Sequence, residues 1–488
     1  MRLKFNVLHE PWIPMANGER HSLLSALENA AALPGVLCAS PLETCAVYRL
    51  MIAFAMDALH LQDRDERTAL LKRGAFDMQP FREYIERCES EGASFDLFDA
   101  RRPFMQSAYD AQVDGEEKRR SAAEIVLDMP SGNNHVFFDH QPTALLRPGD
   151  ALCHLLSAYL FCTAAAQGYP SSVNNTPCVY VLHRGKTLFA TLVLNMLSVA
   201  ECGNIAYGRP AWRAEAQVKP KEEFANVDMF QALTWRPRRV TLICGEGGLV
   251  SELYLQQGHN FKGNALWRDP HVPYRCQKSG EYASLKPQRG RAFWRDMGSL
   301  AASREDRYGR PPLVVANTPR GLPNYDLFLT GLITDNAALV DMVEEEMLLP
   351  RDVLDDGERG DILREDLQFL ENCAAALRRA ADSAGESGRS DQKSFLAPIL
   401  QNTFFQMAHD YILGPYLEAL TGCESEEDYL RQRGDVHEEV LRMLLRTLDK
   451  EKLRLGDDAR NLQIQARMRK SILMRYYAER KKREDEWK

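Results

Sequence analysis

The sequence pairs a histidine with a carboxylate in a way that metal-dependent hydrolases use. His409 and Asp410 stand in the order found in phosphohydrolases of the HD type, where both side chains bind the metal ion. That chemistry needs further histidine and aspartate ligands from other helices, and His437 is the only other histidine in the C-terminal region. A metal-dependent phosphohydrolase therefore stays open as an alternative hypothesis, and a structural role for the pair is favoured.

Two further segments combine residues that catalytic sites use. Trp267–His271 places a histidine near an aspartate, but no serine or cysteine nucleophile accompanies them, which favours a structural turn. Gly245–Gly248 is glycine-rich, but neither a helix start nor a lysine follows it, unlike a phosphate-binding loop. It is better explained as a hairpin turn between strands at Val240–Ile243 and Leu249–Leu253. No phosphate loop or dinucleotide fingerprint is present in the sequence, so we expect a binding protein without a cofactor.

The composition indicates an ordinary globular chain. Its 488 residues allow two or three domains, with 45% hydrophobic and 27% charged residues. The apolar run Cys45–Leu61 contains Arg49 and Asp57, which favours a buried helix over a membrane span. Eleven cysteines without a CxxC pair are predicted to be buried, reduced thiols. With no apolar signal core near the N-terminus, the expected location is the cytoplasm.

Charge is distributed unevenly along the chain. The formal net charge of −8 argues against a protein that coats DNA by itself. Residues 335–371 contain 13 acidic residues and 3 arginines, whereas residues 452–488 contain 12 Lys/Arg and 6 Asp/Glu. Solvated helix faces explain each run on its own. Together, the runs predict that a polyanion is repelled by the first region and attracted by the second.

The apolar patterns predict an α+β fold in two parts. In residues 1–359 we expect a strand at Phe5–Leu8, a helix capped by Ser22, helices over 41–61 and 78–90, and a further helix from Pro148. Short β-hairpins are expected at 240–253 and where Val179–Leu182 is followed by Thr187–Leu192. From residue 360 to 488 the pattern is helical throughout, which predicts an up-down four-helix bundle.

Two polar loops contain small amide, hydroxyl and glycine residues beside apolar anchors. In Pro130–His140, four turn-forming residues precede His135 and the apolar run Val136–Phe138. The second loop, Gly168–Asn175, follows the helix that starts at Pro148. Such loops can present hydrogen-bonding groups to a partner from a fixed position. An ordinary turn that enters a core strand is the alternative for the first loop.

Several separated segments, in order along the chain, resemble one known family. They are Phe5–Pro14, Phe95–Phe98, Pro103–Gln106, Gly132–His140, Tyr169–Asn175, Thr234–Arg238, Trp267–His271 and Thr334–Ala337. Each segment is short, and their order and spacing make the match specific. Together they resemble the large subunit of type I-E Cascade, the CasA family, over nearly the whole length. The helical C-terminal quarter is also similar to the four-helix bundle of that family.

The resemblance implies a role in RNA-guided DNA interference without catalytic activity. It implies a subunit that lies at the crRNA 5′ end among the other Cascade subunits and reads the protospacer-adjacent motif in target double-stranded DNA. It also implies that the subunit helps to open the duplex and recruits a helicase–nuclease. Recognition from the minor groove suits small amides and bare backbone, and guide pairing supplies the remaining specificity. A structural cap of an RNA–protein assembly that does not contact DNA is a further alternative.

The resemblance also implies which residues contact nucleic acid. The first contact loop is implied to be Asn133, Asn134 and His135, with Phe137 or Phe138 as the aromatic anchor or stacking group. The glycine loop of the family corresponds to Gly168, Tyr169, Ser171 and Ser172, with one glycine where some relatives have several. The lysine finger has no counterpart at Gly258-His259, so Lys262 is the nearest candidate.

Two further elements complete the implied interface. The wedge that splits the first base pairs corresponds to Thr334, Asp335, Asn336 and Ala337, with Asn336 where relatives have glutamine. Asparagine is one methylene shorter, so its insertion depth is expected to differ. The basic C-terminal helix, represented by Arg467 and Lys470, is expected to hold a displaced single strand electrostatically. A solvated face of the bundle is the alternative for that helix.

Overall fold

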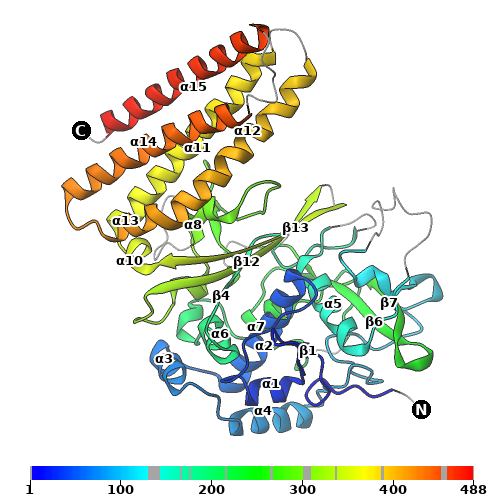
Figure 1. Ribbon diagram of the computed structural model, residues 1–488. Coiled ribbons are helices and arrows are strands. Elements are labelled where there is room, and N and C mark those ends of the chain that lie inside the picture. The colour runs from blue at the N-terminus through cyan, green and yellow to red at the C-terminus, as the bar shows by residue number, and fades with distance from the viewer. Residues whose placement is uncertain are drawn as a thin grey trace. The chain divides into compact units, whose positions relative to one another are not determined.

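The computed structural model divides the chain into two compact units (Figure 1). The first contains residues 1–293 and 299–347, and the second contains residues 294–298 and 348–488. The described residues are 3–129, 143–164, 168–174, 177–214, 217–263, 267–300, 309–335, 338–385, 390–451 and 459–486. The fold combines helices with small sheets, which confirms the predicted α+β class.

Unit 1 is built around one buried helix, α2 (Pro41–Leu59). Ser40 caps it through a bond that its hydroxyl accepts from the amide of Glu43, and Pro41 favours the first helical turn. Nearly every side chain of α2 is buried, because it packs against α4, α5, α6 and α7. The helices around it are α1 (Leu23–Glu28), α3 (Arg64–Arg73), α4 (Gln79–Ser90), α5 (Pro148–Phe161), α6 (Leu188–Asn195), α7 (Met229–Leu233) and α9 (Leu313–Ala316).

Short sheets complete unit 1. The sheet β3-β7-β6 contains β3 (Arg119–Ser121), β6 (Arg238–Cys244) and β7 (Val250–Gln257), which confirms the hairpin around Gly245–Gly248. The sheet β13-β12-β4 contains β4 (Tyr180–His183), β12 (Asn324–Asp335) and β13 (Ala338–Pro350). The others are β1 (Ile13–Pro14) with β2 (Arg20–His21), β5 (Glu223–Phe224) with β8 (Asn260–Phe261), and β9 (Tyr274–Cys276) with β10 (Tyr282–Ser284) and β11 (Gly309–Arg310).

Two of the predicted strands are wrong. Thr187–Leu192 is not a strand, because the Thr187 hydroxyl accepts a bond from the amide of Ala190 and caps helix α6. Its proposed partner, β4, pairs with β12 instead. Phe5–Leu8 forms only an isolated bridge between Asn6 and Asp96, because the Asn6 side chain accepts a bond from the amide of Leu8 and turns the backbone.

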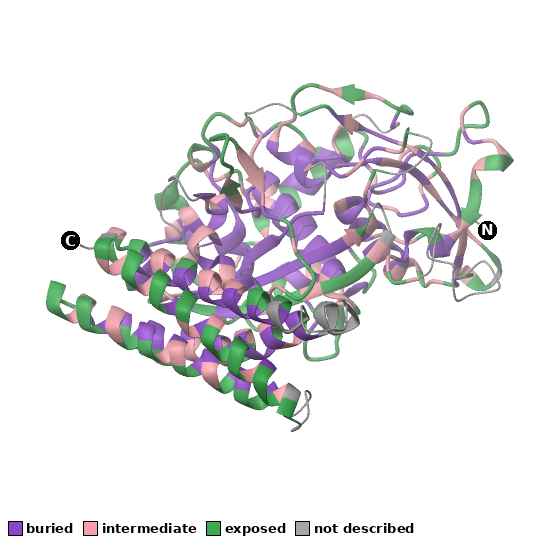
Figure 2. Ribbon diagram, turned by 90° about the horizontal axis from the view of Figure 1, so that it is seen from above, coloured by how far each residue is buried: buried purple, intermediate pink, exposed green. Residues whose placement is uncertain are grey.

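Unit 2 is helical apart from the end of β13. Its long helices are α11 (Gly357–Gly385), α12 (Ser390–Tyr411), α14 (Glu426–Glu451) and α15 (Ala459–Glu486), joined by shorter α10 (Arg351–Leu354), α13 (Leu417–Thr421) and a π-helical turn at Ile412–Tyr416. Helix α11 packs against α12, α14 and α15. Figure 2 shows buried and exposed residues alternating along these helices, as expected for amphipathic faces in a bundle.

Several short helical segments lie between the main elements. They lie at Glu116–Lys118, Ala122–Ile125, Ala200–Cys202, Glu246–Gly248, Phe293–Asp296 and α8 (Met297–Leu300). All eleven cysteines are free thiols and most are buried, as predicted. Among the described helices, none is long and apolar enough on its own to cross a membrane. The bent pair α2 and α3 meets that criterion jointly, but α2 forms the core of unit 1.

A buried carboxyl gives unit 2 a predictable pH dependence. Asp366 on α11 accepts a hydrogen bond of 2.8 Å from the Tyr416 hydroxyl, and burial raises the pKa of its carboxyl to about 7. An unfolded aspartate has a pKa of about 4, so the folded chain holds a proton that the unfolded chain releases between about pH 4 and 7. Its contribution to stability is complete below that window and is lost as the pH rises through it.

Asp366→Asn is therefore expected to stabilise the chain at pH 8 by on the order of 2–4 kcal/mol and to have little effect at pH 4. The amide still accepts a bond from Tyr416 but never ionises. Thermal unfolding of the full chain across this pH range measures the difference. Asp382→Asn, on the exposed face of α11, is the control and should show no such pH dependence. An equal effect of Asp366→Asn at both pH values would contradict the assignment.

Candidate nucleic-acid interface

The loop Gly168–Ser172 is exposed at one end and anchored at the other. Gly168 is exposed with φ +77°, and a Cβ added there would meet no atom within 4 Å. Tyr169 and Ser171 are half-exposed, whereas Pro170 is buried. The amide of Ser172 donates a hydrogen bond of 3.2 Å to the carbonyl of Cys162, at the end of α5. This bond closes the loop at its base and leaves the backbone around Gly168 open for a partner.

Arg238, the first residue of β6, holds this loop in place. Its guanidinium donates to the carbonyl of Thr163 at 3.0 Å and also to the carbonyl of Pro170. The guanidinium lies over the Tyr169 ring, 5.0 Å from the ring centre, and the Tyr169 hydroxyl donates to the carbonyl of Leu255 at 3.4 Å. No described carboxylate forms an ion pair with Arg238. One cation thus fixes both ends of the segment 163–170.

A buried ionic network fixes Asn174, two residues after the loop. Arg49 of α2 binds Asp269 through two hydrogen bonds of 2.7 and 2.9 Å, and Asp269 accepts a third, of 2.9 Å, from Asn174. Burial alone would raise the pKa of Asp269, but the charge and hydrogen bonds of Arg49 outweigh it and lower the pKa. The segment Trp267–His271 therefore positions Asn174, since Trp267 also donates to the Asn174 side chain at 3.0 Å.

The histidine of that segment is not set up as a catalytic base. Burial and the charge of Arg49 lower the pKa of His271 to about 3, so its ring is neutral at pH 7. Its Nδ1 accepts a hydrogen bond of 2.8 Å from Arg49 and is therefore occupied. A structural role for Trp267–His271, as the sequence favoured, agrees with these contacts.

Lys262 and the loop are linked by one hydrophobic cluster. Val173, which follows the loop, packs with Ala232, Trp235 and Phe261, and Phe261 directly precedes Lys262. The Lys262 ammonium is 2.9 Å from the Glu223 carboxylate, and both side chains are more than half exposed, at 57% and 58%. Because an exposed ion pair of this kind is weak, Lys262 can exchange Glu223 for a phosphate.

The neighbouring Gly258-His259 pair is structural. A Cβ at Gly258 would lie 2.5 Å from the carbonyl oxygen of Arg236, so the close approach of these two backbone segments requires glycine. His259 is buried against Phe224 and Trp235, and burial together with the charge of Arg236 lowers its pKa to about 3. A neutral, buried imidazole at this position does not replace the cation of a lysine finger.

The predicted wedge lies at the end of a long hairpin. Thr334 and Asp335 are the last residues of β12, half-exposed and exposed respectively, and β13 begins at residue 338. In the pairing of β12 with β4, Thr330 faces Tyr180 at the start of β4, so the wedge end of β12 extends beyond β4. The chain enters β4 from Asn174, which bonds to the Tyr180 hydroxyl at 3.0 Å. The chain therefore enters β4 at the same end of this sheet as Thr334 and Asp335.

In unit 2, helix α15 presents a row of exposed cations. Arg467, Lys470, Arg475 and Lys481 are exposed, and none forms an ion pair with a described residue. Met474 and Tyr477, exposed by 64% and 54%, occupy the same solvent-facing side of the helix. Arg469, in contrast, lies 3.9 Å from Asp449. Unpaired cations beside an exposed aromatic ring are typical of a surface that binds single-stranded nucleic acid.

Several of the predicted contact residues are either not described by the structure or buried in it. Asn133, Asn134, His135, Phe137, Phe138, Asn336 and Ala337 lie outside the described residues. Ser172 is described, but its side chain is only 2% exposed, so in this conformation it is not open to the direct contact that was predicted. Arg238 and Asn174 had no assigned role in the sequence analysis. The sequence indicated that they belong to the site only through their positions within the matched segments Thr234–Arg238 and Tyr169–Asn175.

The described residues give the phosphohydrolase hypothesis no support. Among them, no group of three or more metal-ligating side chains comes together. The His409 ring bonds to the adjacent Asp410 at 2.9 Å, and both side chains are exposed to solvent. His437, in contrast, is buried and packs its ring 4.1 Å from that of Phe369. The two histidines therefore do not meet in one site.

Comparison with known families decides the identity. The family model described as CRISPR-associated protein Cse1 matches residues 6–455 of the chain. The chain belongs to the CRISPR-associated Cse1 family. The resemblance to the CasA family, the large subunit of type I-E Cascade, is thereby confirmed.

Relatives of this Cse1-family chain share its length and its fold. The CRISPR-associated protein CasA/Cse1 of Thermus thermophilus is 25% identical over 421 residues, which cover 82% of each chain. The structure of Cse1 from Acidimicrobium ferrooxidans has a TM-score of 0.78 at 20% identity and covers 99% of each chain. A chain in a structure described as a CRISPR RNA-guided surveillance complex has a TM-score of 0.75 at 18% identity, covering 96% of this chain and 99% of that one.

Proposed function

We propose that this Cse1-family chain is the non-catalytic large subunit of a CRISPR RNA-guided surveillance complex and reads the protospacer-adjacent motif in duplex DNA. In this proposal it also promotes strand opening, contacts the complex near the crRNA 5′ end and recruits a helicase–nuclease. Family membership supports the place in the complex. The observation that carries motif recognition is the exposed loop Gly168–Ser172, which Arg238 clamps from the side of the core.

The geometry of this loop suits the minor groove. That groove is narrow and presents few donors and acceptors, so small residues and bare backbone can follow it while long side chains cannot. Gly168 leaves space on its outer side, and the clamp keeps the backbone in one conformation before DNA arrives. Lys262 adds a cation that the same hydrophobic cluster places near the loop. Few contacts give permissive recognition, which suits a subunit that scans DNA.

The hairpin of β12 and β13 supports a role in strand opening. Its end extends past β4 on the side where the chain leaves the loop, so one approaching duplex can meet both. In this proposal Asn336 and Ala337, which stand between β12 and β13 in the sequence, insert at the first base pairs while the loop holds the adjacent motif. Insertion between base pairs costs unstacking free energy, which the contacts along the groove offset.

Asn336→Ala is expected to weaken target-duplex binding by the assembled complex roughly tenfold, because one amide that stacks and bonds to base edges contributes about 1–3 kcal/mol. Assembly of the guide complex should be unchanged. Binding is measured by filter retention or mobility shift with a duplex that carries the motif. Asn324→Ala, at the opposite end of β12, is the matched control and should bind as the unsubstituted chain does. Equal binding by both variants would remove the wedge assignment.

The exposed cations of α15 are proposed to hold the displaced strand. Replacing both Arg467 and Lys470 with alanine should lower the slope of log K against log salt by roughly 1.4, because each phosphate contact to a single strand contributes about 0.7. The measurement is target binding by the assembled complex at several salt concentrations. Arg442→Ala on α14 is the control, since Arg442 is exposed but already pairs with Glu439. An unchanged slope in the double variant would leave α15 as a solvated face of the bundle.

A further inference from the structure

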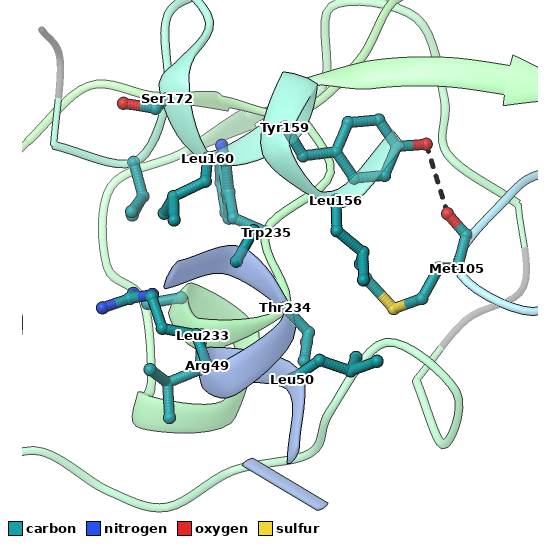
Figure 3. A pocket seen from close by; sticks show the side chains of 13 residues that line it. Arg49, Leu50, Met105, Leu156, Tyr159, Leu160, Ser172, Leu233, Thr234 and Trp235 are labelled. Atoms are coloured by element: carbon teal, nitrogen blue, oxygen red, sulfur yellow. Dashed lines mark hydrogen bonds between the residues drawn. The ribbon is translucent and has the colours of Figure 1, made fainter. Parts of the chain in front are cut away.

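A small cavity adjoins the C-terminal end of the loop Gly168–Ser172 (Figure 3). Its volume is about 30 Å³, and its walls come from α2, α5, the segment Leu233–Trp235 and the end of the loop. Most of the lining is apolar, including Leu50, Leu156 and Leu160. In the view of Figure 3, Trp235 lies between Ser172 and Arg49, which also line the cavity.

Three of the lining residues each have a buried polar side-chain atom without a partner among the described residues. The atoms are the hydroxyl oxygen of Ser172, the indole nitrogen of Trp235 and the Nε of Arg49, and none of them bonds to any described residue. These residues are 2%, 5% and 1% exposed, so bulk water does not reach them. Folded proteins rarely leave such groups unsatisfied, because an unpaired buried donor or acceptor keeps its full desolvation cost.

The other polar side chains of the lining already have partners. The Thr234 hydroxyl donates to the carbonyl of Phe230 at 2.6 Å and accepts from the amide of Ala211 at 2.8 Å. The Tyr159 hydroxyl donates to the carbonyl of Met105 at 3.2 Å, drawn as the dashed line in Figure 3. The lining side chains with unsatisfied hydrogen-bonding groups are therefore Ser172, Trp235 and Arg49. They come from three different segments of the chain.

We propose that this cavity binds one ordered water molecule that bonds to both Ser172 and Trp235 and joins the loop to the core. A buried water needs about 10–15 Å³ of accessible space and two to four polar partners; the cavity has the space, and its lining residues carry three unsatisfied polar atoms. Trp235 and Arg49 supply N–H donors, which water accepts, and the Ser172 hydroxyl accepts a hydrogen of the water in return. The volume is too small for a nucleobase, so a base drawn out of the duplex is not the occupant.

The bound water gives Ser172 a role although its side chain is buried. Ser172 ends the candidate contact loop, and its amide already bonds to Cys162 at the loop base. A hydrogen bond between the bound water and the Ser172 hydroxyl holds the end of the loop at a second position, on the side of α2 and Trp235. This consequence for DNA recognition rests on the proposed function, whereas the water site itself does not.

The water site is tested in the full chain without DNA. A crystal structure at high resolution should show density in the cavity within about 2.7–3.2 Å of at least two of the three atoms. In urea unfolding, Ser172→Ala and Trp235→Phe should each lower the folding equilibrium constant roughly tenfold. The double variant should lose less than the product of the two, because each substitution removes a partner of the same water.

Ser172→Ala combined with Trp212→Phe is the control for this cycle. The Trp212 nitrogen donates directly to the Tyr84 hydroxyl at 2.7 Å, so the two effects should multiply. A dry cavity, or side chains turned to bond each other directly, would overturn the proposal. Multiplicative losses for Ser172→Ala with Trp235→Phe would overturn it as well. Because neither measurement uses DNA, failure here leaves the proposed function to its own binding tests.

Discussion

Replacing Arg238 with methionine is expected to weaken binding of a motif-bearing duplex by the assembled complex roughly 10- to 100-fold. Methionine keeps the aliphatic bulk but loses the bonds to the carbonyls of Thr163 and Pro170 and the contact with the Tyr169 ring. Hydrogen bonds from a charged group contribute about 1.5–3 kcal/mol each, so the loop would no longer be held in one conformation before DNA binds. Equilibrium binding of the assembled complex to duplexes with and without the motif measures the loss.

Two further variants distinguish a loss of affinity caused by a displaced loop from one caused by weaker electrostatic attraction to DNA. Arg238→Lys keeps the charge but not the planar fork, so it should recover only part of the affinity. Arg120→Met is the matched control, because Arg120 is an exposed arginine on β3 whose bonds are to nearby carbonyls. Hydrogen exchange of residues 163–173 should rise in Arg238→Met alone. If Arg238→Lys bound as tightly as the unsubstituted chain, charge rather than loop geometry would explain the role of Arg238.

Breaking the buried pair of Arg49 and Asp269 is expected to produce the largest loss of stability, about 3–5 kcal/mol. Arg49→Met leaves the Asp269 carboxylate buried with two described hydrogen-bond donors, the side-chain amide of Asn174 and the backbone amide of His271, neither of which carries a charge. Both members of the pair are almost fully buried, at 2% and 0% side-chain exposure, so solvent cannot replace the lost partner. Chemical denaturation of the full chain measures the change in the free energy of unfolding.

A solvent-exposed pair in the same unit provides the comparison. Arg184 lies 3.4 Å from Asp326, with both side chains about 40% exposed, so Arg184→Met should cost no more than about 1 kcal/mol. The double variant Arg49→Met with Asp269→Leu should recover part of the loss, because it leaves no uncompensated charge. A cost for Arg49→Met as small as that for Arg184→Met would show that the network does not support the core.

The spacing of apolar residues predicted the long helices but not the conformation of the short apolar runs. Helix α2 and the helices of unit 2 have a helical pattern over many residues, and Ser22 supplies the predicted cap of α1. Thr187–Leu192, in contrast, is too short for its pattern to separate strand from helix. Its conformation is decided by the capping hydroxyl of Thr187 and by the pairing of β4 with β12, 144 residues away at its first pair, Leu327 with His183.

The candidate interface was located in the sequence only through its resemblance to a family, and contacts between distant segments explain why. Arg238 lies 75 residues from Thr163, and Asp269 lies 220 residues from Arg49. No local pattern encodes such pairs. Composition likewise did not reveal that Ser172 is buried or that Glu223 pairs with Lys262. The exposed cations of α15 are the exception. The positions of the polar residues along a predicted helix indicate which side of that helix faces the solvent.

Photo-crosslinking from the loop tests the central claim most directly. The assembled complex would carry p-benzoylphenylalanine in place of Tyr169, whose ring is half-exposed beside Gly168. With a target duplex bearing the protospacer-adjacent motif, we expect crosslinks to the motif nucleotides and their loss when the motif is replaced. Tight target binding with no crosslink from this position, or with crosslinks that ignore the motif, would contradict recognition by this loop.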